Sequence, residues 1–116
     1  MIIRKLKDSD LDNFFDKIKE LYGKIDFLVH SIAYAPLEDI RCSTVDVSRK
    51  GFLTVMESSV YSFIAASKRA SALMDPGSSI LTLTYFGGEK VINGYNLMGV
   101  AKSALESSVK YLALDL

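Results

Sequence analysis

The sequence has a single cysteine and no excess of charge, and both features narrow the classes of protein to consider. Cys42 is the only cysteine, so no disulfide can form within the chain, and a reducing cytoplasmic setting fits best. The 14 basic and 14 acidic residues cancel, which removes the argument for a nucleic acid or an anionic membrane as the main partner. The short basic cluster of Arg4, Lys5 and Lys7 is interpreted as a solvated edge.

Long apolar runs and clusters of metal-binding residues are lacking as well. No segment approaches the roughly 18 uncharged apolar residues that a membrane-spanning helix needs. Charged residues follow soon after Met1, so no signal peptide is expected. His30 is the only histidine, and no carboxylate stands at metal-ligand spacing from it. It is interpreted as a packed, hydrogen-bonded residue, and no metal site is predicted.

The sequence does contain the pattern of an α/β fold. Its 116 residues, nearly half of them apolar, suit one globular domain. The predicted order is a helix over residues 8–22, a strand in 25–31, a helix from 43 or 44 to 74, a strand in 80–86 and a helix from 94 to 116. The long connection between the strands indicates a parallel sheet, with each strand buried on both faces.

Two strands are fewer than a doubly wound sheet contains, since such sheets usually carry about five or more. The N-terminal "MIIRKL" could add at most the end of a third strand. The last helix reaches Leu116 without the Gly, Asn or Pro that commonly ends a helix. The sequence therefore predicts a single incomplete domain over residues 1–116, with elements of a larger fold missing at both ends.

Two tyrosines and a lysine form the candidate catalytic group. Tyr85 and Tyr95 stand ten residues apart, and Lys102 follows seven residues after Tyr95. If Tyr95 opens the last helix, Tyr95 and Lys102 share one helical face, and the ammonium group should lower the pKa of the phenol. Such a phenol can donate a hydrogen bond to an oxygen that gains negative charge. The spacing alone is also compatible with chance, with Tyr85 an ordinary rim residue.

The position of this group along the chain favours a binding site. Tyr95 follows the second strand and its loop, and the loop after the first strand carries the small residues Ser31, Ala33 and Ala35. The carboxyl ends of parallel strands meet at one edge of a sheet, which is where ligands bind in open α/β folds. Small side chains there would let a flat ligand approach the backbone closely. Met98, considered alone, is interpreted as a core residue of the last helix.

Three segments together carry a family resemblance: "LVHSIAYAP", "LTLTYFG" and "YNLMGVAKSALESSVKYLALDL". In this order they resemble the NADH-dependent enoyl-acyl-carrier-protein reductases of bacterial type II fatty-acid synthesis, over residues 5–116. That family belongs to the short-chain dehydrogenase/reductase superfamily. Its Tyr-x6-Lys spacing, with a second tyrosine ten residues earlier, differs from the Tyr-x3-Lys of most of the superfamily. The resemblance implies a Rossmann-like fold and reduction of the trans-2 double bond of enoyl thioesters with NADH.

The resemblance also implies roles for individual residues. Tyr95 matches the tyrosine that binds the thioester carbonyl oxygen and stabilises the enolate formed on hydride transfer. Lys102 matches the lysine that binds the nicotinamide ribose, and Tyr85 matches the tyrosine that borders the acyl pocket. The other implied residues are Ser31, Ile32 and Ala33 for the cofactor and Tyr34, Ala35 and Met98 for the substrate pocket. The implied partners are an enoyl thioester on acyl carrier protein and further copies of the chain, in a tetramer.

Parts of the family pattern are not found in this sequence. The glycine-rich turn that holds the cofactor pyrophosphate should precede this chain, and Lys7 and Asp8 stand near the place of the Asp-Val pair that lies beside the adenine. The isolated 116 residues are therefore expected to show little or no reductase activity in a crotonyl-thioester assay with NADH. The alternative hypothesis is a truncated, inactive remnant that acts only as a subunit-interaction module.

Overall fold

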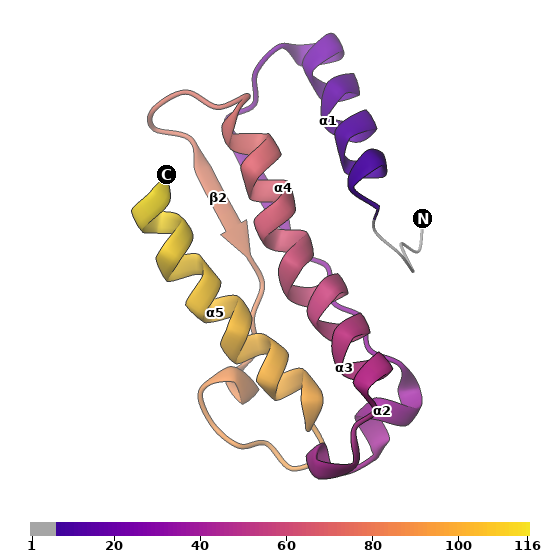
Figure 1. Cartoon of the computed structure of the whole chain (residues 1–116). Helices are drawn as coiled ribbons and strands as arrows, with labels where there is room; N and C mark the ends of the chain where they lie inside the picture. Colours follow the sequence, from indigo (N-terminus) through magenta and orange to yellow (C-terminus); the bar gives the residue numbers. More distant parts are fainter. Residues whose placement is uncertain (1–6) are drawn as a thin grey trace.

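The computed structural model describes residues 7–116, which form helices packed on a two-stranded parallel sheet (Figure 1). The elements follow in the order α1 (Asp8–Tyr22), β1 (Phe27–His30), α2 (Leu37–Arg41), the 3-10 turn η1 (Thr44–Asp46), α3 (Arg49–Met56), the π-helical turn η2 (Glu57–Tyr61), α4 (Ser62–Ser71), β2 (Ser79–Thr82), the 3-10 turn η3 (Phe86–Gly88) and α5 (Leu97–Asp115). The predicted alternation of helices and strands is confirmed. The strand end predicted in "MIIRKL" lies outside the described residues.

The two strands pair in parallel, as predicted. Phe27 lies opposite Ser79 and His30 lies opposite Thr82. Because the strands run in the same direction, the connection between them must return along the sheet, and α3 and α4 form most of this crossover. The carboxyl ends of β1 and β2 therefore meet at one edge, and the chain leaves this edge twice, after His30 and after Thr82.

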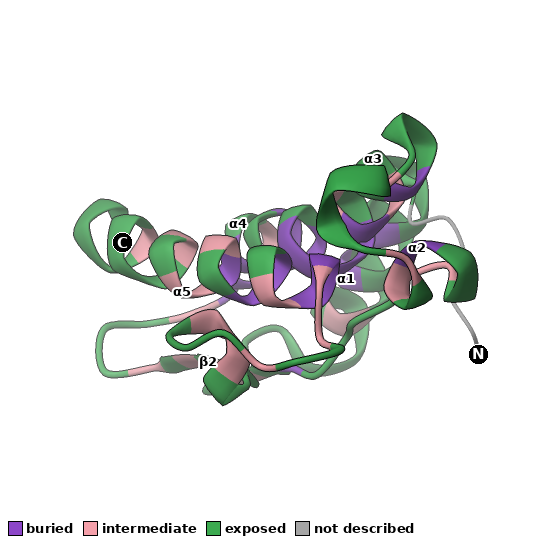
Figure 2. Ribbon diagram, turned by 90° about the horizontal axis from the view of Figure 1, so that it is seen from below, coloured by how far each residue is buried: buried purple, intermediate pink, exposed green. Residues whose placement is uncertain are grey.

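Helices cover one face of the sheet within the described residues. Leu28 and Ile80, paired in register, contact the hydrophobic clusters formed by the helices. Phe27, Val29 and Leu81 alternate with them and remain 66%, 52% and 51% exposed. The prediction that the strands are buried on both faces is wrong for residues 7–116, because strand side chains alternate between faces and α4 and α5 lie on one side of β2 (Figure 2).

The segments α3, η2 and α4 form one continuous crossover helix over residues 49–71. This helix begins later than predicted and contains an irregular turn. Its cap is Ser48, whose Oγ accepts a hydrogen bond from the amide of Gly51 at 2.8 Å, whereas residues 44–46 form a separate 3-10 turn. Residues 57–61 form the π-helical turn, in which Ser58, Ser59 and Val60 are all buried. Regular helix α4 likewise buries the consecutive residues Ala65, Ala66 and Ser67, because this helix is packed between α1 and α5.

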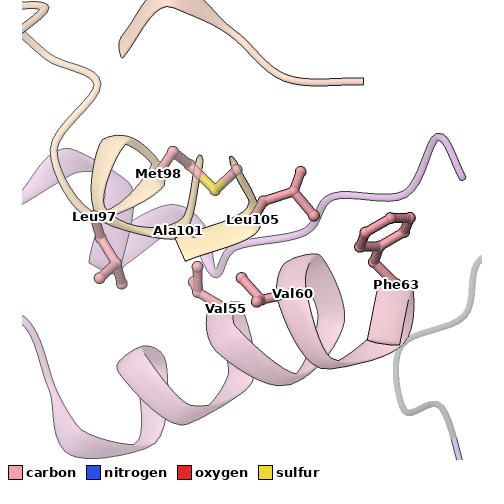
Figure 3. Packing of buried hydrophobic residues seen from close by; sticks show 7 residues of the cluster. All are labelled: Val55, Val60, Phe63, Leu97, Met98, Ala101 and Leu105. Carbon is pink, nitrogen blue, oxygen red and sulfur yellow. The ribbon is translucent and has the colours of Figure 1, made fainter. Parts of the chain in front are cut away.

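The main hydrophobic core joins the crossover helix to α5 (Figure 3). Its members are Val55, Val60 and Phe63 from the crossover and Leu97, Met98, Ala101 and Leu105 from α5. A second cluster joins α1 to α4, so α4 lies between α1 and α5 (Figure 1). The first turn of α5 belongs to the main core, and packing therefore fixes the chain directly after Tyr95.

Candidate active site

The predicted site residues gather beyond the carboxyl ends of the two strands. Residues 31–35 follow β1 directly, and Tyr85 and Tyr95 lie in the segment between β2 and α5. Lys102 lies in the second turn of α5 and reaches back to the end of β2, where its Nζ donates a hydrogen bond to the carbonyl of Leu83 at 2.9 Å. The topology thus brings segments from three parts of the sequence to the edge where the sequence predicts a binding site.

Tyr85 and Tyr95 form a pair of contacting aromatic rings. Their ring centroids are 4.8 Å apart, and the planes meet at 68°, an edge-to-face arrangement. Tyr95 is half-buried against the main core, whereas Tyr85 is 49% exposed. Gly87 contributes to this packing, because a Cβ at that position would overlap the ring of Tyr95. The glycine therefore lets the phenol ring lie against the backbone of η3.

Burial, followed by the repulsion that a charged Tyr85 would exert, raises the pKa of the Tyr95 phenol above its usual value. The prediction that Lys102 lowers this pKa is wrong. Its ammonium group donates to the carbonyl of Leu83, and burial dominates the environment of the phenol. Tyr95 therefore keeps its proton at neutral pH and remains a hydrogen-bond donor.

Tyr95 also lies outside the helix that it was predicted to open. The amide of Tyr95 donates to the carbonyl of Ile92 at 3.0 Å, and α5 begins two residues later at Leu97. Between them, Asn96 has φ 47° and ψ −125°. This backbone conformation directs the chain away from a helical path, so Tyr95 and Lys102 do not share a helical face. Their relation in space depends on the turn and not on helical periodicity.

Lys102 is almost fully buried, with 8% of its surface exposed. Burial lowers the pKa of its ammonium group, and the carboxylate of Glu106 acts in the opposite direction. Glu106 itself accepts a hydrogen bond from Thr84 Oγ1 at 2.6 Å. An ammonium group has three donor protons, and Leu83 takes one, so Lys102 retains capacity to bind hydroxyl groups at the end of β2.

The loop after β1 is exposed, and one buried serine of the π-helical turn holds it. Ser59 Oγ accepts a hydrogen bond from the amide of Tyr34 at 3.1 Å and lies 3.3 Å from the carbonyl of the same residue. Ser31, Ile32 and Ala33 are exposed beside it. The loop is thereby fixed at Tyr34, while the segment predicted to pack along a cofactor stays accessible.

Two of the predicted pocket residues face the protein interior. Ala35 packs against the main core, and Met98 is a member of it with 8% exposure. The structure therefore brings Tyr85 and Tyr95 into direct contact and places Lys102 at the adjoining strand end. Met98 and Ala35 lie beneath this edge in the core, and their predicted role in a pocket stays a prediction.

His30 is the packed, hydrogen-bonded residue that the sequence predicts. Its Nδ1 lies 3.0 Å from Thr82 Oγ1, and its Nε2 lies 2.8 Å from Ser62 Oγ. Ser62 Oγ also donates to the carbonyl of Ser58 at 2.7 Å, and Thr82 Oγ1 donates to the carbonyl of His30 at 3.3 Å. Burial, followed by the charge of Lys102, lowers the pKa of His30. A neutral imidazole thus joins β1 to β2 and to the start of α4.

Sequence reasoning missed two residues of this region, Ser59 and Asn96. A π-helical turn has no recognisable sequence signal, so the burial of Ser59 could not be anticipated. Asn96 carries a weak signal, because asparagine adopts a positive φ more readily than most residues and stands directly before a helix. Its side-chain amide donates to the carbonyls of Ile40 and Cys42 at 2.7 Å and 2.9 Å.

The arrangement suits proton donation to an oxygen. A neutral phenol at a sheet edge can donate to an oxygen that develops negative charge, and the neighbouring ammonium group can bind hydroxyls. Among residues 7–116, no cluster of histidine, cysteine or acidic residues could hold a metal ion. In the same range, no helix has both the length and the apolar character required to cross a membrane.

Comparisons with known proteins show the family to which the sequence is similar. A sequence model of the family described as "Enoyl-(Acyl carrier protein) reductase" matches residues 6–116. The chain is 52% identical over 108 residues to an enoyl-[acyl-carrier-protein] reductase [NADH] of Rhizobium meliloti, covering 93% of this chain and 40% of that protein. It is 49% identical over 110 residues to a reductase of the same description from Rickettsia conorii, covering 95% of this chain and 42% of that protein.

Solved structures show the same relationship. The enoyl-[acyl-carrier-protein] reductase (NADH) of Aquifex aeolicus superposes with a TM-score of 0.91 at 47% identity, over 94% of this chain and 44% of that one. The Anaplasma phagocytophilum enzyme, solved in complex with NAD, gives a TM-score of 0.91 at 47% identity, over 95% of this chain and 42% of that one. The chain thus spans about two fifths of the length of the relatives it matches.

Proposed function

Because the chain belongs to the enoyl-(acyl carrier protein) reductase family, we propose that it forms the catalytic centre of an enzyme that reduces enoyl thioesters carried on acyl carrier protein. The observation that carries the proposal is the neutral, half-buried phenol of Tyr95 at the edge where Lys102 and the loop after β1 also lie. Relatives that match the chain are named for this activity.

Tyr95 is the proposed proton-holding group. When a hydride adds to a conjugated thioester, negative charge develops on the carbonyl oxygen, and a hydrogen bond from the phenol would stabilise it. A raised pKa favours this role at neutral pH, since the phenol keeps the proton that it donates. Tyr85 packs edge-to-face against the Tyr95 ring, and this contact helps to position the phenol.

NADH is the proposed cofactor, and the residues at the strand ends fit its nicotinamide end. Lys102 has free donor protons for ribose hydroxyls, and the exposed small residues Ser31 and Ala33, with Ile32, form a surface that a flat ring can approach. The cofactor supplies the hydride when bound. The chain's own residues place the substrate oxygen and hold the proton. Tyr34, Ala35, Tyr85 and Met98 are the proposed boundary of the acyl pocket.

Self-association and a cytoplasmic location complete the proposal. Apolar side chains remain exposed along the crossover helix and α5, among them Leu53, Ile64, Val100 and Val109. Burial of such surface against another copy is favourable, so a homo-oligomer is the proposed assembly.

The proposed location is the cytoplasm. Cys42 is free and has no partner for an intrachain disulfide, which suits a reducing compartment.

A chimeric enzyme tests the proposed activity directly. Residues 6–116 replace the matching segment of the Rhizobium meliloti reductase, and oxidation of NADH is followed with crotonyl thioester as substrate. We expect turnover, and we expect Tyr95→Phe to reduce kcat by about 100- to 1,000-fold, because it removes one donor to the developing oxyanion.

Tyr22→Phe is the matched control, since Tyr22 is 70% exposed at the end of α1, away from the strand ends. Its kcat should equal that of the unsubstituted chimera. A chimera that folds and binds NADH but does not reduce the thioester would contradict the proposal, as would a Tyr95→Phe variant with full activity.

A further inference from the structure

Asn96, which directly follows the proposed catalytic tyrosine, has an unusual backbone conformation. Its φ of 47° makes it the one residue other than glycine with a positive φ among residues 7–116. With ψ at −125°, it occupies the first central position of a type II′ turn, closed by a hydrogen bond from the amide of Met98 to the carbonyl of Tyr95 at 3.1 Å. A residue with a Cβ is strained in this conformation and persists there when its surroundings hold it.

The side chain of Asn96 shows what holds it. Both protons of its amide nitrogen are used, one on the carbonyl of Ile40 at 2.7 Å and one on the carbonyl of Cys42 at 2.9 Å. These carbonyls lie at the carboxyl end of α2, where a helix leaves its last carbonyls without helical partners and carries a partial negative charge. Two carbonyl oxygens can only accept hydrogen bonds, so the side chain at this position must donate to both of them, as the NH₂ group of Asn96 does.

The residues on either side of Asn96 are fixed by packing. Leu97 is 1% exposed and Met98 is 8% exposed, both in the main core, which anchors the chain after Asn96. Before it, the ring of Tyr95 lies between Tyr85 and the backbone of Gly87. The position of Tyr95 relative to α5 thus depends on the backbone at Asn96, and the side-chain amide of Asn96 attaches this backbone to α2.

We propose that Asn96 is a positioning residue for Tyr95, which rests on the catalytic role proposed for that tyrosine. By holding the type II′ turn, the amide keeps Tyr95 out of the helical path and in contact with Tyr85, where the phenol is half-buried and keeps its proton. Without these two hydrogen bonds, the segment before α5 is no longer attached to α2, so its backbone can leave the type II′ turn and the hydroxyl can move away from the substrate oxygen.

Two substitutions separate the amide from the backbone strain. Asn96→Gly tolerates φ 47° without strain but lacks the amide, so the fold is retained and only the link to α2 is lost. Asn96→Asp keeps the size but places carboxylate oxygens against two carbonyl oxygens. In the chimera with the Rhizobium meliloti reductase, we expect both to lower kcat by about 10- to 100-fold, as misplacement of a reacting group by about 1 Å does. The KM for NADH should change by less than about two-fold, because cofactor binding is not affected.

Asn93→Asp is the matched control, since Asn93 is exposed in the same segment and makes no side-chain hydrogen bond within residues 7–116. It should leave kcat unchanged. A double variant with Tyr95→Phe tests whether Asn96 acts through the tyrosine. We expect Asn96→Gly to cost less than about two-fold in the Tyr95→Phe background, since there is no hydroxyl left to position.

The outcomes distinguish the two proposals. An inactive unsubstituted chimera that folds would overturn the proposed function. An active chimera in which Asn96→Gly and Asn96→Asp keep full kcat would overturn the positioning role alone. Equal losses from Asn96→Gly with and without the Tyr95 hydroxyl would also overturn it, because that result indicates a general structural effect.

Discussion

At the scale of single residues, burial determines which protonation states the site holds. His30, Tyr95 and Lys102 each have a pKa shifted toward the neutral form, and burial is the largest cause for each. For the tyrosine this preserves a donor, and for the histidine it preserves a ring with one donor and one acceptor nitrogen. The phenol of Tyr95 is therefore a neutral, partly buried donor, and a hydrogen bond from such a donor to a developing oxyanion is stronger than one in water.

The lowered pKa of His30 predicts a specific dependence of stability on pH. Below the usual histidine pKa of 6.5, the unfolded chain binds a proton more readily than the folded chain does. The free energy of unfolding should therefore fall as the pH decreases from about 7.5 to about 5.5. Urea unfolding of the 116-residue chain at the two pH values measures this loss.

His30→Gln is the variant that isolates this effect, because His30 is the only histidine of the chain. We expect it to be less stable at both pH values, since Thr82 and Ser62 lose a hydrogen-bond partner. Its stability should nevertheless change little between them. The same loss in the variant and the unsubstituted chain would show that another group is responsible.

Sequence reasoning predicted these residues unevenly. The packed, hydrogen-bonded state of His30 could be predicted because this residue ends an apolar strand and no carboxylate stands at metal-ligand spacing from it. The pKa of Tyr95 was predicted in the wrong direction, because the prediction assumed that Tyr95 lies on the helix. The side-chain contacts of Asn96 reach residues about 55 positions earlier, and a single sequence does not indicate such pairs.

At the scale of elements, the start of the crossover helix depends on a buried carboxylate. Asp39 in α2 is 5% exposed, and its Oδ1 accepts a hydrogen bond from the amide of Ser48, the cap of α3. A negative charge is favourable at this end of a helix. Gly51 lies against the same carboxylate, and a Cβ there would overlap it. From the sequence, Gly51 is a weak point in a helix, whereas in the structure its lack of a side chain makes room for Asp39.

Gly51→Ala tests this interpretation through the sign of its effect. Helix propensity alone predicts stabilisation of about 1 kcal/mol. Overlap with the Asp39 carboxylate predicts destabilisation of about 1–3 kcal/mol, as for other overpacked sites. We expect destabilisation in urea unfolding, and a smaller effect in an Asp39→Ala background, where the obstacle is removed. Stabilisation in the unsubstituted background would contradict the structure of this helix start.

The helix boundaries show why element positions were predicted less well than element types. Helix α1 matches its predicted range because its apolar spacing and flanking residues agree. The crossover helix was predicted to begin at Ser43 or Thr44, but Ser48 provides the cap and residues 44–46 form a separate turn. Ser43, Thr44 and Ser48 all have hydroxyl groups that can cap a helix, and the hydrogen bond from the amide of Ser48 to Asp39 favours Ser48.

At the scale of the whole molecule, apolar surface remains exposed on two sides. Phe27, Val29 and Leu81 line the sheet face opposite the helices, and Leu53 and Ile64 lie on the outer surface of the crossover helix. The sequence pattern predicted strands buried on both faces, and the alternation along β1 and β2 shows which side chains are exposed instead. Uncovered strands and apolar helix faces both favour association.

The 116-residue chain is therefore expected to associate in solution. Sedimentation velocity over a range of concentrations should show species larger than 12.8 kDa, the mass of one chain. Leu53→Lys should shift the distribution toward the monomer, because it places a charge on the outer surface of α3. Val45→Lys, at a residue that is 89% exposed in η1, is the control. A monomer at all concentrations would contradict the expected assembly.

The parallel pairing of β1 and β2 has a consequence for the rate of folding. His30 and Thr82 are bonded across 52 residues of sequence, and each pair of the register has this same separation. Forming the sheet therefore requires a long segment to close before any strand contact stabilises it. Helices α4 and α5 are separated by a shorter segment, residues 72–96, and substitutions in the contact between them should alter the folding rate. Substitutions in the strands should mainly accelerate unfolding.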